Sequence, residues 1–232
     1  KILIFGGYQV KSVLGEGGLG IVYLAKQLSM KRSVALKVLY PKWMKDEEFR
    51  KRFLLEARIA GKLSHPNLIQ VFDIGHDKGR YYFSMEYVAG NTVDTIIQKD
   101  GLMPLSKAID ISLQVLDALN YIWSKNLVHR DIKPGNIIVT AQDVAKLGDF
   151  GFVKSKIDKK IGSEDFVLGT PDYMSPEQAM GKESLDYRSD IYSLGATLYQ
   201  MITGFVPYQG SESMVIRQHI QSALPSPRTV NP

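Results

Sequence analysis

Hydrophobic and polar positions change their spacing about a third of the way along the chain. In the first part, short runs rich in β-branched and aromatic residues are separated by turn residues, which is typical of strands. Strands are predicted at residues 8–14, 21–26, 33–39, 68–74 and 80–87. Residues 46–63 instead carry apolar side chains three and four positions apart, as an amphipathic helix does. Pro66 should mark the end of this helix, because the residue before a proline avoids helical conformation.

Helical spacing dominates the chain after Gly90. Helices are predicted at residues 106–125, 189–203 and 211–222, with Ser106 as the N-cap of the first. A strand-rich part followed by a helix-rich part predicts two lobes, with their boundary near residues 86–90. Ligands often bind at such boundaries, so this region is a candidate for a binding site.

Composition and charge narrow the class of protein. The 232 residues are 44% hydrophobic, as in a globular protein, and the formal net charge of +5 is too small to indicate nucleic-acid binding. The absence of cysteine excludes disulfides and thiolate-bound metals and fits a reducing compartment. No apolar run is long enough to span a membrane. We therefore expect a cytoplasmic location without membrane contact by this segment. Because the chain opens at Lys1 rather than Met, an anchor outside it stays open.

The first candidate for chemistry is a glycine-rich loop. Four of the six residues in Gly15-Glu16-Gly17-Gly18-Leu19-Gly20 are glycine, and a predicted strand lies on each side. Such a loop lets backbone N–H groups come close to phosphate oxygens. The alternative is a flexible hairpin that binds nothing. A dinucleotide-binding turn is disfavoured, because that turn should be followed by a helix.

Lys37 lies in an otherwise apolar predicted strand. A lysine there is costly unless its ammonium group finds an anion or reaches water. Glu56, near the middle of the predicted helix that follows, could pair with Lys37 and hold it towards a phosphate. The alternatives are a lysine that extends to solvent and a glutamate on a solvated helix face.

The densest group of polar residues is His129-Arg130-Asp131-Ile132-Lys133-Pro134-Gly135-Asn136. Within it, Asp131 could accept a proton from a hydroxyl, Lys133 could neutralise a phosphate, and Asn136 offers a hard oxygen ligand for Mg²⁺. Asp149-Phe150-Gly151 adds a second carboxylate further along. The alternative is an ordinary polar loop, which is disfavoured because residue type and spacing agree at so many positions.

Together these motifs resemble those of the eukaryote-like protein kinase family, over residues 8–231 and in the family's order. The matching segments are Gly15-x-Gly17-x-x-Gly20-x-Val22, Val34-Ala35-Leu36-Lys37, His129-Arg130-Asp131 with Asn136, Asp149-Phe150-Gly151, Ser175-Pro176-Glu177, and Asp190-Ile191-Tyr192-Ser193-Leu194-Gly195. Lys133 and Gly169-Thr170-Pro171 are typical of serine/threonine kinases. The segment around Tyr173-Met174 and the tail from Leu224 look most like those of bacterial members.

The resemblance implies an α+β, two-lobed protein-kinase fold. The N-lobe, residues 1–87, would hold an antiparallel sheet and one helix. A mainly helical partial C-lobe, residues 88–232, would be shortened at its C-terminal helices. The resemblance also implies ATP and Mg²⁺ as cofactors, with Mn²⁺ as the alternative ion. Protein substrates with serine or threonine are the implied partners, and an N-lobe homodimer is a further candidate.

The resemblance assigns roles to individual residues. Lys37, held by Glu56, would contact the α- and β-phosphates, and Asn136 with Asp149 would hold Mg²⁺. Asp131 would accept the substrate proton and Lys133 would stabilise the transferring phosphoryl group. The implied ATP-binding residues are Leu14, Gly15, Gly17, Gly20, Val22, Ala35, Met85 as gatekeeper, Glu86, Val88 and Ile138. Asp190 would brace the catalytic loop, and His129 would be a packed core residue.

Two departures from the family pattern affect these expectations. The arginine that usually pairs with the residue matching Glu177 is missing, so we expect a costly unpaired carboxylate in a shortened domain. The implied regulatory residues are Arg130, Ser163 and Thr170. Either Ser163 is the phosphorylated residue, or the carboxylates at positions 164 and 165 partly supply a phosphate's charge to Arg130.

Two other functions compete with that of a serine/threonine kinase. A pseudokinase-type ATP-binding scaffold is disfavoured because no motif residue is missing among Lys37, Glu56, Asp131, Asn136 and Asp149. A small-molecule kinase of related fold usually lacks the peptide-docking segment that residues 169–177 resemble in this chain.

Overall fold

The computed structural model describes residues 3–149, 171–182 and 184–231. It divides into two compact units. The first is Lys1–His65 together with Ile69–Val88, and the second is Pro66–Leu68 together with Ala89–Pro232. Among the described residues, no helix has the length and apolar character that crossing a membrane requires.

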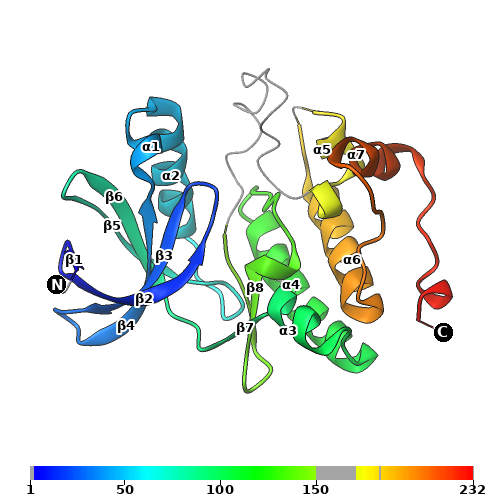
Figure 1. Ribbon diagram of the computed structural model, residues 1–232, viewed down its shortest axis with the longest axis horizontal. Coiled ribbons are helices and arrows are strands. Elements are labelled where there is room, and N and C mark those ends of the chain that lie inside the picture. The colour runs from blue at the N-terminus through cyan, green and yellow to red at the C-terminus, as the bar shows by residue number, and fades with distance from the viewer. Residues whose placement is uncertain (1–2, 150–170, 183, 232) are drawn as a thin grey trace. The chain divides into compact units, whose positions relative to one another are not determined.

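A six-stranded antiparallel sheet forms the first unit, in the order β1-β2-β3-β4-β6-β5. Its strands are β1 (Ile4–Phe5), β2 (Tyr8–Glu16), β3 (Gly20–Gln27), β4 (Arg32–Leu39), β5 (Val71–Asp77) and β6 (Arg80–Glu86). The helices α1 (Pro41–Met44) and α2 (Glu47–Ala60) follow β4 (Figure 1). The short helix α1 was not predicted, since four residues are too few to show a helical period.

Helix α2 begins where the sequence predicts it. The Asp46 carboxylate accepts hydrogen bonds from the amides of Glu48 and Phe49, which satisfies two of the unpaired N–H groups of the first turn. The apolar stripe of α2 includes Phe53, which is fully buried and packs against Phe83 of β6 at a ring distance of 5.0 Å. The helix ends at Ala60, three residues before the predicted end, with Gly61 in the C-cap position.

The two faces of β4 have different neighbours. Val34, Leu36 and Val38 pack in a core cluster with Phe5, Tyr8, Ala25 and Tyr82. Ala35, Lys37 and Leu39 alternate with them and therefore point to the opposite face. Phe83 is directly opposite Lys37 in the register and touches α2, so this second face is the one that α2 covers.

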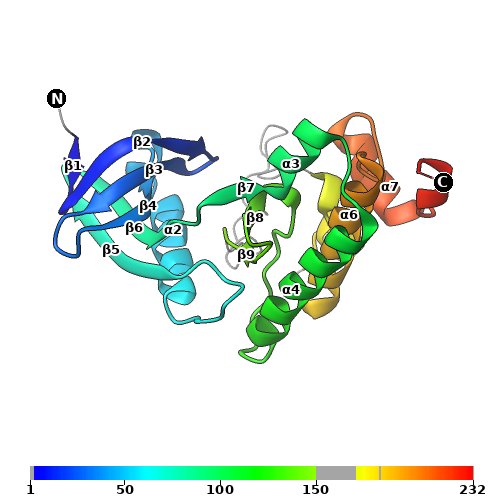
Figure 2. The same ribbon diagram turned by 90° about the horizontal axis from the view of Figure 1, so that it is seen from below.

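The second unit is built mainly from helices, with a three-stranded sheet in the order β7-β8-β9. Its strands are β7 (Gly90–Thr92), β8 (Ile137–Thr140) and β9 (Ala145–Leu147). Its helices are α3 (Val93–Asp100), α4 (Leu105–Trp123), α5 (Pro176–Ala179), α6 (Tyr187–Thr203) and α7 (Glu212–Gln221), with 3₁₀ turns η1 (Pro134–Asn136), η2 (Pro171–Tyr173) and η3 (Pro227–Thr229). Helices α4 and α6 pack against each other (Figure 2).

Two local predictions are wrong. Ser106 is not an N-cap: α4 begins at Leu105 with Pro104 in the capping position, where the ring fixes a φ of −54° and the side chain makes no capping hydrogen bond. The strand predicted from residue 68 begins at Val71. Leu68, the first residue of the predicted strand, belongs to the second unit and forms a parallel bridge there with Leu147.

Candidate active site

Lys37 and Glu56 form an ion pair inside the first unit. The Lys37 Nζ lies 3.4 Å from Oε1 of Glu56, and their side chains are 10% and 13% exposed. Helix α2 supplies Glu56 and β4 supplies Lys37, so the packing of α2 on the sheet brings the two charges together. Lys37 also lies 5.6 Å from the centre of the Phe83 ring. A lysine in this setting is held in one place with its charge compensated.

Three apolar ATP-binding candidates, one each on β3, β4 and β6, share the face of Lys37. Val22 is directly opposite Lys37 in the β3–β4 register, and Met85 is directly opposite Ala35 in the β4–β6 register. Residues paired in this way point to the same face, and so do Ala35 and Lys37, two positions apart. The sheet therefore places three apolar side chains beside one cation.

The remaining candidates of the first unit lie at strand ends. Leu14 is 45% exposed on β2, in the irregular part of the β2–β3 register. Glu86 ends β6, and its amide donates to the carbonyl of Gln70 at 2.8 Å. Val88 is the last residue of the first unit, whereas Ile138 lies on β8 of the second unit.

The glycines of the glycine-rich loop have different steric surroundings. A Cβ on Gly20 would lie 2.1 Å from the carbonyl oxygen of Val38, so only glycine fits there without moving the backbone. A Cβ on Gly15 or Gly18 would meet no atom of the described residues within 4 Å. The fold therefore requires glycine at the base of β3, whereas the tip of the loop is open enough for a ligand to approach the backbone.

In the second unit, Asp131, Lys133 and Asn136 form one cluster. Lys133 Nζ donates to Asp131 Oδ2 at 3.1 Å. The Asn136 amide nitrogen donates to the same oxygen at 3.0 Å and to the Asp131 backbone carbonyl at 2.8 Å. The Asp131 side chain is 19% exposed, so the carboxylate is oriented by its neighbours and still reachable from solvent. A carboxylate held in this way can accept a proton from a bound hydroxyl.

Asp190 holds the backbone of this loop. It is fully buried on α6, and its carboxylate accepts hydrogen bonds from the amides of His129 at 2.9 Å and Arg130 at 2.8 Å. It also accepts a bond from the indole of Trp123 at 2.9 Å. The contact that the kinase resemblance implies is therefore present, and His129 is fully buried. Hydrophobic spacing along the sequence does not reveal the bond from Trp123, because its donor and acceptor are 67 positions apart.

Arg130 connects the catalytic loop to α5. Its backbone has a φ of +68°, which is uncommon for a residue other than glycine. Its carbonyl accepts a hydrogen bond from the Gln178 side chain at 3.0 Å. Gln178 also completes a capping box with the buried Ser175 at the start of α5. Burial lowers the pKa of Arg130, and the nearby Asp190 opposes this effect.

The Asn136 and Asp149 side chains have the chemistry of a magnesium site. They lie just outside the paired ends of β8 and β9, where Ile137 is opposite Leu147 and the Gly148 amide donates to the Asn136 carbonyl at 2.9 Å. Both offer oxygen ligands, which Mg²⁺ prefers. Asp149 has a φ of +53°. Within the described ranges there is no group of three or more His, Cys, Asp and Glu side chains that could hold a metal ion.

The expectation of an unpaired carboxylate at Glu177 is wrong. Glu177 is only partly buried, and its Oε1 accepts a hydrogen bond of 2.6 Å from the Ser189 hydroxyl at the start of α6. The family pattern points to a distant arginine and misses this nearby hydroxyl. Phe150, Gly151, Ser163 and Thr170, with the carboxylates at 164 and 165, lie outside the described residues.

The fold and these clusters define a protein kinase domain, and comparisons with known proteins agree. The family model described as "Protein kinase domain" matches residues 8–230, so the chain belongs to this family. A probable serine/threonine-protein kinase of Clostridium perfringens is 40% identical over 225 residues, which cover 97% of this chain and 33% of that protein. The serine/threonine-protein kinase PrkC of Bacillus subtilis is 38% identical over 230 residues, which cover 99% of this chain and 35% of that protein.

A solved structure shows the same fold. The crystal structure of the kinase domain of PknI from Mycobacterium tuberculosis matches with a TM-score of 0.76 and 29% identity, over 99% of this chain and 83% of that chain. The predicted two-lobed kinase fold and the resemblance to bacterial serine/threonine kinases are thereby confirmed. The chain spans about a third of the length of the Clostridium perfringens and Bacillus subtilis relatives.

Proposed function

We propose that this domain transfers the γ-phosphate of ATP to serine and threonine hydroxyls of protein substrates. The observation that carries the proposal is the cluster in which Lys133 and Asn136 both donate to Oδ2 of Asp131, on a loop that Asp190 holds. The relatives from Clostridium perfringens and Bacillus subtilis that this domain matches are named as serine/threonine-protein kinases.

Each residue of the two clusters receives a role. Asp131 orients the substrate hydroxyl and accepts its proton, while Lys133 stabilises the transferring phosphoryl group. Lys37 contacts the α- and β-phosphates, and Glu56 keeps its ammonium group in place at 3.4 Å. Asn136 and Asp149 would hold Mg²⁺, or Mn²⁺ in its stead, which would neutralise charge on the phosphate oxygens. Positioning and charge stabilisation provide most of the rate, since the transition state is loose.

The adenine ring is assigned to the apolar candidates. Leu14, Val22, Ala35 and Ile138 would contact the ring, and Met85 would limit the space behind it. Glu86 and Val88 would offer backbone groups to its polar edge. In support, Val22, Ala35 and Met85 share the sheet face of Lys37 in the first unit. The regulatory roles of Arg130, Ser163 and Thr170 are part of the same proposal.

Phosphate transfer to a generic basic protein tests the proposal. We expect Lys37→Met, Asp131→Asn and Asp149→Asn each to lower the rate by about a hundredfold or more, because each removes charge that orients or stabilises the reacting groups. Lys11→Met and Asp143→Asn are the matched controls. Lys11 donates to the nearby Gln9 side chain on exposed β2, and Asp143 pairs with Lys107 on the surface.

Two results would contradict the proposal. Near-normal transfer by Lys37→Met or Asp149→Asn at saturating ATP and Mg²⁺ would remove the assigned roles. ATP binding by the wild-type protein without any transfer would favour the pseudokinase scaffold instead. Thermal melts of all variants separate a loss of activity from a loss of fold.

A further inference from the structure

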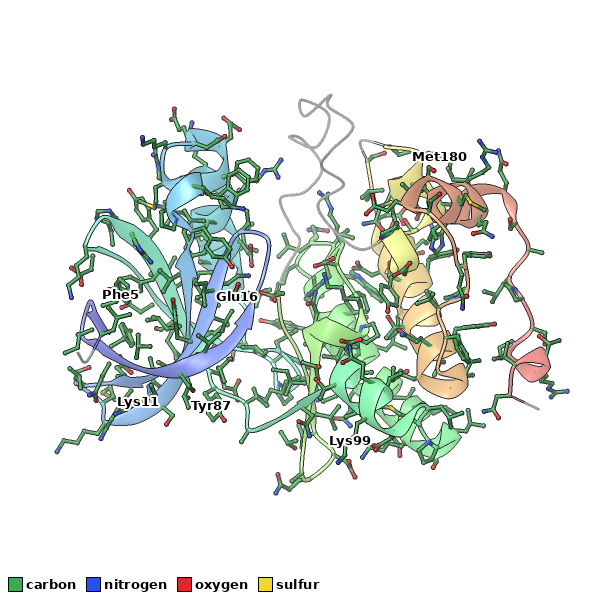
Figure 3. The ribbon with its side chains drawn as sticks, viewed as in Figure 1. Phe5, Lys11, Glu16, Tyr87, Lys99 and Met180 are labelled. Carbon is green, nitrogen blue, oxygen red and sulfur yellow. The ribbon has the colours of Figure 1, made fainter. Side chains whose placement is uncertain are left out.

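Three hydrogen bonds join the tip of the β2–β3 hairpin to residues 40–43, all within the first unit. The Trp43 indole Nε1 donates to the carbonyl of Gly18 at 2.9 Å. The Tyr40 amide donates to the carbonyl of Leu19 at 2.9 Å, and the Tyr40 phenol donates to the Glu16 carboxylate at 3.1 Å. Glu16 ends β2 at this hairpin (Figure 3). The three bonds therefore reach Glu16, Gly18 and Leu19 of the glycine-rich loop.

The Trp43 ring is itself held firmly. It stacks on Phe49 of α2 with ring centres 4.0 Å apart and an interplanar angle of 25°. Phe49 is buried, and its amide is one of the two that Asp46 caps. Lys42 lies 4.9 Å from the centre of the Trp43 ring, within the range of a cation–π contact. The indole N–H is therefore presented from a fixed position on α1, against the first turn of α2.

The geometry of the peptide bond then orients the loop. In a trans peptide, the carbonyl and the following N–H point in opposite directions. Because the Gly18 carbonyl faces Trp43, the N–H of Leu19 points away from it. The Leu19 carbonyl faces Tyr40, so the N–H of Gly20 also points away. The Gly17 amide closes the turn by donating to the Gly20 carbonyl at 2.9 Å. Neither N–H group faces the residue that holds its neighbouring carbonyl, and backbone N–H groups of such a loop can bind a phosphate oxygen.

We propose that Trp43 and Tyr40 are positioning residues for the glycine-rich loop, and that they set the affinity of the domain for ATP. The inference rests on the proposed function, since it concerns how that function's loop meets the triphosphate. A loop already ordered in the binding geometry loses less conformational freedom when the nucleotide binds. Without these anchors, four glycines in a six-residue segment would have to be ordered by the ligand itself.

The test compares Trp43→Phe with the wild-type chain. Phenylalanine keeps an aromatic ring against Phe49 and removes the N–H that reaches Gly18, together with part of the stacked surface of the indole. We expect the dissociation constant for ATP with Mg²⁺, and KM for ATP, to rise about threefold to tenfold, the value of one lost hydrogen bond. At saturating ATP, kcat should stay within about twofold, because the reacting groups are untouched. A purely structural role would not produce this separation of KM from kcat.

Hydrogen exchange gives a readout that does not need activity. Without nucleotide, the amides of residues 15–20 should exchange faster in Trp43→Phe than in the wild type, because the turn loses an anchor. Tyr40→Phe removes only the hydroxyl that reaches Glu16 and should act in the same direction. It also preserves the test if Trp43→Phe folds poorly. Tyr81→Phe is the control: it removes a hydroxyl from β6, on a ring whose centre lies 4.5 Å from that of the His76 ring.

The outcomes separate this inference from the proposed function. Unchanged ATP affinity and unchanged loop exchange in both Trp43→Phe and Tyr40→Phe would overturn the inference. An equal loss of affinity in Tyr81→Phe would also overturn it, since the effect would then not come from the loop contacts. ATP binding that weakens in the two variants, in a wild-type protein that transfers no phosphate, would support the anchoring and overturn only the proposed function. A wild-type protein that does not bind ATP would overturn both.

Discussion

At the scale of single residues, Asp190 holds the loop that carries Asp131 in the second unit. One buried carboxylate satisfies two backbone amides of the catalytic loop and the Trp123 indole. Hydrogen bonds to a charged acceptor are stronger than those between neutral groups. The shape of the loop, and with it the position of Asp131, therefore depends on a residue of α6 that accepts bonds from backbone and indole N–H groups.

We expect Asp190→Asn to lower the free energy of unfolding by about 2–3 kcal/mol, because its amide group would face N–H donors in a buried site. Phosphate transfer should fall with it. Asp186→Asn is the matched control on the same helix: Asp186 caps α6 and pairs with Arg188 at the exposed surface. Urea unfolding of both variants measures the difference. Equal destabilisation by the two changes would contradict the role given to Asp190.

Two glycines of the glycine-rich loop are expected to serve different purposes: Gly20 is required by the fold, whereas Gly15 is required for binding of the ligand. Gly20→Ala should lower the melting temperature, because its Cβ would lie 2.1 Å from the Val38 carbonyl and the backbone must move. Gly15→Ala meets no described atom within 4 Å and should keep the melting temperature while weakening ATP binding. Thermal melts with and without ATP measure both effects. A lower melting temperature for Gly15→Ala would count against this distinction.

At the scale of elements, the packing of α7 against α6 should depend on pH. His219 of α7 is 3% exposed, its Nδ1 lies 2.8 Å from the Tyr192 hydroxyl of α6, and its ring meets the Tyr208 ring edge-on. Burial lowers the pKa of His219, because a charged imidazolium would lose its hydration. The same packing raises the pKa of Tyr192 to about 12.

The sign of the effect follows from proton binding. Between the lowered pKa of the folded state and the ordinary value near 6.5, the unfolded chain binds more protons at His219 than the folded chain. The contribution of neutral His219 to the free energy of unfolding is therefore fully present above about pH 6.5, and it is lost as the pH falls towards the lowered pKa. We expect the melting temperature of the wild type to fall between about pH 7.5 and 5.5 more steeply than that of His219→Asn. Parallel curves for the two proteins would contradict the assignment.

The elements also show how far a single sequence predicts structure. Strands and helices with a clear period, such as β3, β4, α2 and α6, are predicted to within a few residues of their observed bounds. One error falls where a long-range contact decides, at Leu68, which pairs with Leu147, and another is local, at the start of α4, where Pro104 takes the capping position. Hydrophobic spacing contains no information about either feature.

At the scale of the whole molecule, the sequence predicts which residues form the candidate site better than it predicts the contacts that hold them. Family motifs single out Lys37, Glu56, Asp131 and Asn136, and the structure shows each in a hydrogen-bonded cluster inside its own unit. The motifs do not indicate Trp43 as an anchor of the glycine-rich loop, nor Ser189 as the partner of Glu177. Motifs report the residues that a family pattern contains, whereas these two partners follow from the packing of the folded chain.

The second unit includes a segment from an earlier part of the sequence. The Asn67 carbonyl accepts a bond from the Leu147 amide at 2.8 Å, and its side chain donates to Gln114 and to the Ala145 carbonyl. A fragment that begins at Ala89 lacks Asn67 and its bonds. We therefore expect this fragment to melt at a lower temperature and less cooperatively than a second fragment, residues 66–232 from which the first-unit segment Ile69–Val88 has been deleted. Circular dichroism melts compare them, and identical curves would contradict the expectation.

The path of the chain limits how such domains can be recombined. Because Pro66–Leu68 belongs with the residues after Ala89, the polypeptide passes between the two units at three places instead of one. A chimera that joins the sheet of this protein to the helices of a relative at a single crossover would carry a foreign tripeptide beside β9. Exchanging residues 66–68 together with the helical half would restore the matched pairing, so a functional hybrid requires three junctions.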